Sequence, residues 1–161
     1  MRIGITGHQR LSDPSSWEWV KREMLALAEK SPRPLIAVSS LAIGADQLFA
    51  ELVLQNGGTL EAVIPFEGYE KTFTDDVDKD SYQSLLGRSS RVEVLPKTDS
   101  DEEAYLGAGR RVVDLCELLV AVWDGKPAAG LGGTGDVVEY AHKIQRNVVH
   151  LNPTTRRILE K

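Results

Sequence analysis

The sequence predicts an α/β fold: a single Rossmann-like domain over residues 1–161, with a doubly wound parallel sheet of about six strands and helices on both faces. Two observations predict it. Short apolar runs alternate with longer segments of helical periodicity along the whole chain, and no repeat, linker or low-complexity segment interrupts that order. Strands joined by helical crossovers run parallel, and helices then cover both faces of the sheet.

The first half of the chain supplies three strands and two helices. A short strand over 2–6 ends at a glycine. A helix over 14–30 follows, because apolar residues recur at helical spacing until a Ser-Pro-Arg-Pro segment ends it. A buried strand over 35–38 precedes a helix over 45–55, which stops at Asn-Gly-Gly. The third strand, 60–64, stops at a proline.

The second half continues the alternation after a weaker segment. From Phe66 to Asp80 we expect a loop with a turn or two of helix. Acidic residues at Asp99–Glu103 suit the first turn of a helix, where they complement its dipole. The remaining expected elements are a helix over 81–86, a strand over 91–95, a helix over 99–116, a strand over 118–123, a helix over 134–146 and a last strand over 147–151.

The unusual sequences of this chain fall where expected strands end. They are the segments 7–10, 39–46, 65–69 and the glycine-rich stretch from Asp124. In doubly wound sheets, ligands bind beyond the carboxyl ends of the strands, near the point where the strand order reverses. We therefore expect these four loops to converge on one crevice.

The stretch from Asp124 to Glu139 carries the clearest ligand signal. It follows the apolar run Leu118–Trp123 and leads through glycines into a helix, whose first N–H groups favour phosphate. Carboxylates repel phosphate, so we expect Asp124 and Asp136 to face a sugar or a base, unless Asp136 only caps the helix. The residues expected at the phosphate are Gly132, Gly133, Thr134 and Gly135. The stretch predicts a nucleotide site.

Glu139 is the candidate catalytic carboxylate. It lies about one helical turn beyond Gly135, so its side chain is expected to share a face with the glycine loop. Cleavage of an N-glycosidic bond passes through a cationic, oxocarbenium-like sugar, which a carboxylate stabilises. The alternative is an exposed helix glutamate. One of Arg110 and Arg111 is expected to reach the crevice, where the planar donors of an arginine suit phosphate, and the other is expected to be solvated.

Further candidate ligands follow the first two strands. His8 and Arg10 would supply positive charge to a phosphate. Asp46 opens a helix, where it either binds a sugar hydroxyl or complements the dipole. Ser39 and Ser40 either donate hydrogen bonds to phosphate or only end the strand. Tyr69, Phe73 and Tyr82 would stack on a base or, as is expected for most of them, pack in the core or cover the end of the sheet. The ligand set from these loops is Gly7, His8, Arg10, Ser39, Gly44 and Asp46.

Composition and motifs exclude several classes of function. A net charge of −5 argues against nucleic acid and anionic membranes as partners. The chain starts on a strand without a leader and has no apolar run near the ~20 residues of a membrane span, so a cytoplasmic protein is expected. The single Cys116 excludes an intrachain disulfide.

No cofactor or metal is expected. Gly130, Gly132 and Gly135 spell G-x-G-x-x-G, but in the last strand–helix unit rather than the first, which argues against a nicotinamide enzyme. No Walker-type Gly-Lys-Ser/Thr exists, and one cysteine with three scattered histidines offers no zinc site. The alternation over 76–80 resembles a calcium loop but lacks its glycine and closing glutamate.

Three motifs resemble the SLOG superfamily of Rossmann-like nucleotide-binding proteins, which includes the LOG phosphoribohydrolases and DNA-processing protein A. They are Gly4-Ile-Thr-Gly7, Ser39-Ser-Leu-Ala-Ile-Gly-Ala-Asp46 and Gly132-Gly-Thr-Gly-Asp-Val-Val-Glu139. The resemblance implies phosphate binding by the glycines, a ribose or catalytic role for Glu139 and a homodimer. It also implies a catalytic arginine on the preceding helix, for which Arg111 is the candidate. This chain has Leu131 and Asp136 where LOG enzymes have proline and threonine, and a carboxylate in place of the threonine repels phosphate.

Ala121–Gly125 together with Gly135 and Glu139 is also similar to nucleoside 2-deoxyribosyltransferases. Both resemblances imply chemistry at the N-glycosidic bond of a nucleoside or nucleotide. The first expectation is therefore a domain that binds a nucleotide or related ribose phosphate, with phosphoribohydrolase-like hydrolysis as its enzymatic form. A non-catalytic nucleotide sensor is the alternative. A DNA-associated protein is the third hypothesis, and the net acidity weighs against it.

Overall fold

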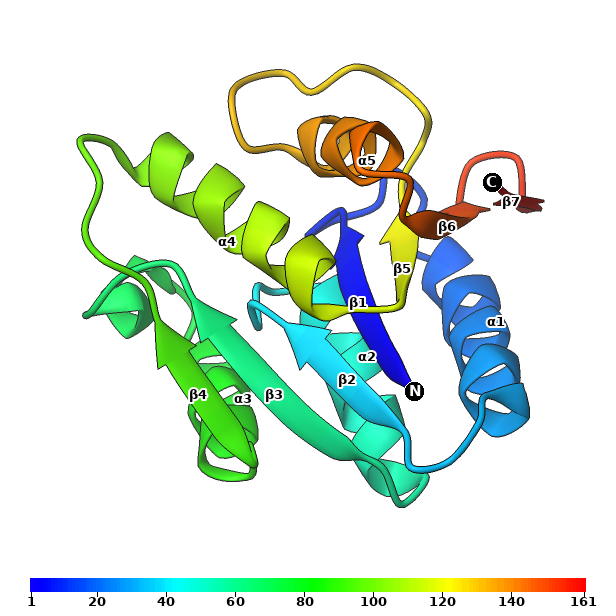
Figure 1. Cartoon of the computed structure of the whole chain (residues 1–161), viewed down its shortest axis with the longest axis horizontal. Helices are drawn as coiled ribbons and strands as arrows, with labels where there is room; N and C mark the ends of the chain where they lie inside the picture. The colour runs from blue at the N-terminus through cyan, green and yellow to red at the C-terminus, as the bar shows by residue number, and fades with distance from the viewer.

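The computed structural model describes all 161 residues and confirms the α/β, Rossmann-like fold. Seven strands form one sheet in the order β4-β3-β2-β1-β5-β6-β7, with only β7 antiparallel (Figure 1). Their bounds are β1 (Arg2–Gly7), β2 (Ile36–Ser39), β3 (Thr59–Ile64), β4 (Arg91–Val94), β5 (Leu118–Val122), β6 (Asn147–Asn152) and β7 (Arg157–Glu160).

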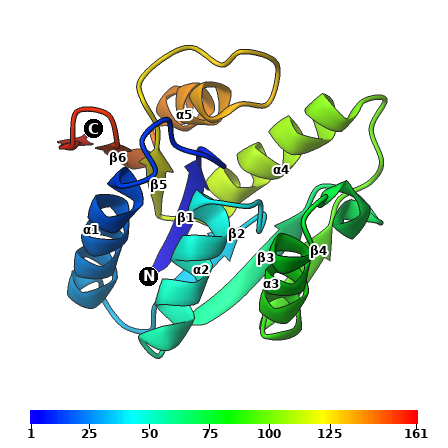
Figure 2. The same cartoon turned by 180° about the vertical axis from the view of Figure 1, so that it is seen from behind.

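Helices cover both faces of the sheet, as expected. α1, α2 and α3 lie on one face and α4 and α5 on the other, which Figures 1 and 2 show from opposite sides. Each face has its own apolar core because strand side chains point alternately to the two faces. The bounds are α1 (Ser16–Lys30), α2 (Ala45–Gln55), α3 (Asp76–Gly87), α4 (Asp101–Leu115) and α5 (Thr134–Lys143), with a 3-10 turn η1 (Tyr69–Thr72).

The strand order reverses between β1 and β5. These strands are neighbours, and their carboxyl ends align, since Gly7 pairs with Val122. α1, which follows β1, and α5, which follows β5, lie on opposite faces of the sheet, so the two loops after these strands diverge. A glycine is needed at this point, because a Cβ atom on Gly7 would lie 2.6 Å from the Cβ of Ala45.

Several element bounds differ from the expected ones. α3 begins at Asp76 rather than Ser81, because the Asp75 carboxylate accepts hydrogen bonds from the N–H groups of Val77 (2.8 Å) and Asp78 (3.4 Å). The calcium-like segment is therefore helical. The strand β7 was not expected; it pairs antiparallel with β6 after a four-residue turn.

No helix has the length and apolar character that crossing a membrane requires. No group of three or more histidine, cysteine, aspartate or glutamate side chains is arranged to hold a metal ion.

Candidate functional site

A cavity of about 760 Å³ opens at the β1–β5 reversal, beyond the carboxyl ends of the strands. All four expected loops contribute to it. Nine predicted ligand residues line it: Gly7, His8, Arg10, Asp46, Asp124, Gly132, Gly133, Thr134 and Gly135. The other five predicted site residues do not line it: Ser39, Gly44, Arg111, Asp136 and Glu139.

The start of α5 presents free backbone donors to this cavity. Gly133 is the N-cap residue, and the N–H groups of Gly133, Thr134 and Gly135 have no hydrogen-bond partner in the protein. The next N–H upstream, that of Gly132, donates to Oδ2 of Asp136 at 2.9 Å. The Asp136 carboxylate is therefore engaged with its own loop, while three amides remain available to an anion.

The loop from Asp124 to Gly133 folds back over the start of α5. A Cβ atom on Gly133 would lie 2.8 Å from the Cβ of Ala128, and one on Gly135 would lie 3.1 Å from the Ala128 nitrogen. Gly132 has a φ of +88°, and its Cβ would lie 2.8 Å from the carbonyl oxygen of Glu102 in α4. Close packing of the loop therefore favours glycine at these three positions.

Gly44 and Ser39 have structural roles in place of the expected ligand roles. Gly44 has a φ of +84°, and a Cβ there would lie 2.5 Å from the carbonyl oxygen of Gln9, so the glycine lets the β1–α1 loop pack on the start of α2. The fully buried Ser39 hydroxyl accepts a hydrogen bond from the N–H of Leu41 at 3.0 Å. Its neighbour Ser40 lines the cavity instead.

Glu139 and Arg111 lie outside the cavity, contrary to the geometry expected for a catalytic pair. The buried face of α5 is formed by Val137, Val138 and Ala141, which turns Glu139 outward into an exposed position. The Nε of Arg111 donates to both carboxylate oxygens of Glu93 on β4, at 3.0 and 3.1 Å. Neither side chain is placed to touch a ligand at the β1–β5 reversal.

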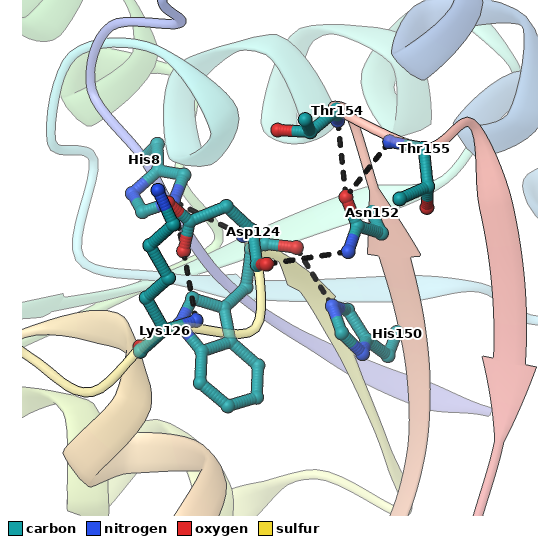
Figure 3. A network of polar contacts seen from close by, with 8 residues as sticks. His8, Asp124, Lys126, His150, Asn152, Thr154 and Thr155 are labelled. Atoms are coloured by element: carbon teal, nitrogen blue, oxygen red, sulfur yellow. Dashed lines mark hydrogen bonds and ion pairs between the residues drawn. The ribbon is translucent and has the colours of Figure 1, made fainter.

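A polar network fixes the edge of the cavity formed by Asp124 (Figure 3). Nε2 of His8 lies 3.2 Å from the backbone nitrogen of Asp124, whose N–H it accepts when the ring is neutral, and a protonated ring instead pairs with the Asp124 carboxylate. Oδ1 of Asp124 accepts the N–H of Lys126 at 3.0 Å and lies 3.4 Å from His8 Nε2. Partial burial raises the pKa of Asp124, but the Lys126 hydrogen bond and His8 outweigh it, and the net shift is downward. Asp124 is therefore an anion at neutral pH.

Asp46 is the buried acid of the cavity. Only 7% of it is exposed, and no basic side chain pairs with it. Loss of hydration raises its pKa to about 7, although hydrogen bonds from the backbone of Ala42 and Ser40 act in the opposite direction. Asp46 can therefore donate a proton in a hydrogen bond near neutral pH, which an ordinary aspartate cannot.

An aromatic wall borders the same cavity. Tyr69 from η1, Phe73 and Tyr105 from α4 all line it, and the Tyr69 ring meets Phe73 and Tyr105 edge to face with centroids 5.2 and 6.2 Å away. The sequence singled out Tyr69 and Phe73 but missed Tyr105, because a tyrosine in the first turns of a helix carries no sign of which side chains it will meet. Lys126, Asp78 and Trp123 also line the cavity and were not predicted.

The comparisons with known proteins identify the fold. No protein-family model and no curated protein sequence matches the chain. Solved structures do match. DNA processing protein A from Streptococcus pneumoniae is 21% identical with a TM-score of 0.65, over 92% of this chain and 49% of that one. DNA processing protein A from Helicobacter pylori is 18% identical with a TM-score of 0.68, over 93% and 64%.

The molybdenum cofactor carrier protein of Chlamydomonas reinhardtii matches with a TM-score of 0.54 and 18% identity, over 94% of this chain and 75% of that one. The expected likeness to DNA-processing protein A is thus confirmed at the level of the fold. This chain spans about half the length of the Streptococcus protein and 64% of the Helicobacter protein.

One expectation is corrected by these matches. The net charge of −5 led us to regard nucleic acid as an unlikely partner. The Helicobacter protein has the same fold and binds single-stranded DNA. Net charge describes the whole surface, whereas a strand needs only a local site, so the acidity of this chain does not exclude nucleic acid.

Proposed function

We propose that this chain binds a nucleotide or a related ribose phosphate in the cavity at the β1–β5 reversal, without cleaving it. One observation carries the proposal: free amides at the start of α5, a buried acid and an aromatic wall all border a single cavity. These are the donors, the hydrogen-bonding group and the stacking surface that a phosphate, a sugar and a base require.

The size of the cavity supports a ligand of this class. Its volume of about 760 Å³ lies within the range of small-molecule and cofactor sites. The free N–H groups of Gly133, Thr134 and Gly135 suit the phosphate. The rings of Tyr69, Phe73 and Tyr105 offer the apolar contact that a base needs.

Binding without turnover fits the placement of the acids better than hydrolysis does. The phosphoribohydrolase route gives Glu139 and an arginine the catalytic roles, and neither Glu139 nor Arg111 lines the cavity. The two carboxylates that do line it with hydrogen bonds from the backbone are Asp46 and Asp124. In this proposal, both recognise hydroxyls or base edges of the ligand.

Calorimetric titration with AMP and with ribose 5-phosphate tests the proposal, using the variant Tyr105→Ala. Removing the ring takes away stacking energy of roughly 1–3 kcal/mol, so AMP should bind about tenfold more weakly. Ribose 5-phosphate has no base, and its affinity should not change. The matched control is Tyr140→Ala, which removes a tyrosine of α5 that does not line the cavity, and AMP should bind this variant like the wild type.

The proposal fails if neither compound binds at millimolar concentration, or if Tyr105→Ala weakens both equally. Chromatography of the same mixtures for free adenine separates binding from hydrolysis. Release of adenine that Glu139→Gln abolishes would replace the binding role with the enzymatic one.

A further inference from the structure

A second, smaller hollow adjoins the candidate site. Its volume is about 470 Å³, and it shares His8, Arg10 and Asp124 with the main cavity. Its other walls come from the β1–α1 loop, the start of α1 and the turn between β6 and β7, which contributes Arg156. The lining is nearly all polar, so this hollow suits a charged group rather than a base.

The two arginines of the hollow have no partner. Neither Arg10 nor Arg156 makes an ion pair or a side-chain hydrogen bond. The two carboxylates are already engaged. Oδ1 of Asp13 accepts the N–H and the hydroxyl of Ser15, at 3.0 and 2.7 Å, and Asp124 is held by Lys126 and His8.

Arg156 lies near Asp13, but the Asp13 carboxylate does not neutralise its charge through an ion pair. The hydrogen bonds from Ser15 are the main reason that the pKa of Asp13 is lowered, and the charge of Arg156 adds a smaller effect in the same direction. No nitrogen of Arg156 lies within 4.0 Å of an Asp13 oxygen, so the two side chains do not form an ion pair. The guanidinium groups of Arg10 and Arg156 therefore remain free to bind an anion.

The turn that carries Arg156 is fixed to the main cavity. Oδ1 of Asn152 accepts the N–H groups of Thr154 and Thr155, at 3.0 and 3.1 Å, and its Nδ2 donates to the carbonyl oxygen of Asp124 at 3.3 Å (Figure 3). Arg156 itself has a φ of +53°. Asn152 thus ties the turn that carries Arg156 to the loop that borders the proposed nucleotide site.

We propose that the second hollow binds a second phosphoryl group of the same ligand, through Arg10 and Arg156. The ligand class is then a nucleotide with two separated phosphates, of the kind joined by a phosphodiester, rather than a mononucleotide. This inference rests on the proposed function, since the first phosphate is the one at α5. Guanidinium groups suit it because their planar donors match phosphate oxygens.

Two phosphates separated along a phosphodiester backbone occur both in a free dinucleotide and in a single strand of nucleic acid. A titration with ligands of increasing length distinguishes these two kinds of ligand. The probes are AMP, the 5′-phosphorylated dinucleotide pApA and a six-nucleotide deoxyadenylate, measured at low salt. We expect pApA to bind at least about tenfold more tightly than AMP, because a charge-assisted arginine–phosphate contact is added. A further gain with the hexamer assigns the ligand to a strand, and no further gain assigns it to a free dinucleotide; both results support the second phosphate site.

The variant Arg156→Asn tests the residue that only the second hollow contains. Asparagine tolerates a positive φ, so the turn should be retained while the guanidinium is lost. The affinity for pApA should fall about tenfold toward that for AMP, while the affinity for AMP stays unchanged. The control Arg91→Ala removes an exposed arginine from β4, at the other edge of the sheet, and should leave both affinities unchanged.

Two results would overturn the inference and leave the proposed function in place: equal affinities of the wild type for AMP and pApA, or an unchanged pApA affinity in Arg156→Asn. If neither AMP nor pApA binds, the proposed function and the second site fail together. Circular dichroism of Arg156→Asn verifies that the variant is folded in each comparison.

Discussion

Asp46 shows how one residue links the fold to the site. It opens α2, where a carboxylate would complement the helix dipole, yet it is almost wholly removed from water. The sequence left open whether Asp46 binds a ligand or serves the helix. The raised pKa favours a ligand role, because a residue that only served the dipole would be better placed in solvent, as an anion.

Asp46 should make the stability of the protein depend on pH. Its pKa is 3.8 in the absence of structure and about 7 in the fold, so between these values the folded state holds a proton that the unfolded state has released. Stability therefore falls as pH rises from 4 to 7, by at most about 4 kcal/mol from this group. Urea unfolding at pH 5, 6, 7 and 8 measures it.

The variant Asp46→Asn removes the titrating group and is the matched comparison. It should lose this part of the pH dependence, so that its stability relative to the wild type improves from pH 5 to about pH 7 and then levels off toward pH 8. A constant difference between the two proteins over that range would show that Asp46 does not titrate there.

At the scale of elements, glycines reveal where sequence reasoning succeeded and where it did not. The order of strands and helices up to β6 was predictable, because the spacing of apolar residues and the helix- or strand-breaking residues mark each of these elements. The convergence of the four loops followed from the parallel topology. A glycine in a loop, however, signals that some group approaches the backbone closely, without saying whether that group belongs to a ligand or to another part of the chain. At Gly44 the approaching group is the carbonyl oxygen of Gln9.

The misplaced residues have a common physical cause. Glu139 was placed by its helical spacing from Gly135, and Arg111 by its position on the helix that precedes the fifth strand. Neither position fixes the absolute rotation of its helix, which decides where the side chain points. The rotation of α5 is set by Val137, Val138 and Ala141 against the sheet. β7 was missed because its four residues are all exposed, so no apolar alternation marks it.

The packing of the β1–α1 loop on α2 should depend on Gly44. Substitution by alanine places a Cβ 2.5 Å from a backbone oxygen at a φ of +84°, which should lower the free energy of unfolding by about 2 kcal/mol or more. The matched control is Gly107→Ala inside α4, where a Cβ meets nothing within 4 Å. It should raise stability by about 0.5–1 kcal/mol. Equal effects in chemical denaturation would refute the structural role of Gly44.

Over the whole molecule, stability should decrease from the centre of the sheet to its edges. β1 and β5 are paired on both sides and lie between the two apolar cores. At the edges, all four residues of β7 are exposed, and Val92 and Val94 of β4 are 45% and 51% exposed. Few buried apolar contacts support either edge strand, so each can separate while the rest of the sheet remains.

Native-state hydrogen exchange measures this gradient and tests the position of the ligand at once. We expect the amides of β1 and β5 to exchange only by global unfolding, with a strong dependence on added urea, and those of β7 to exchange by local opening with little dependence. Saturating AMP should slow exchange most at Gly133, Thr134 and Gly135, whose N–H groups have no partner in the free protein. Because β4 does not line the cavity, its amides should gain only what global stabilisation gives them. Protection of β7 equal to that of β1 would contradict the gradient, and AMP protection centred on β4 would place the ligand at a different part of the sheet.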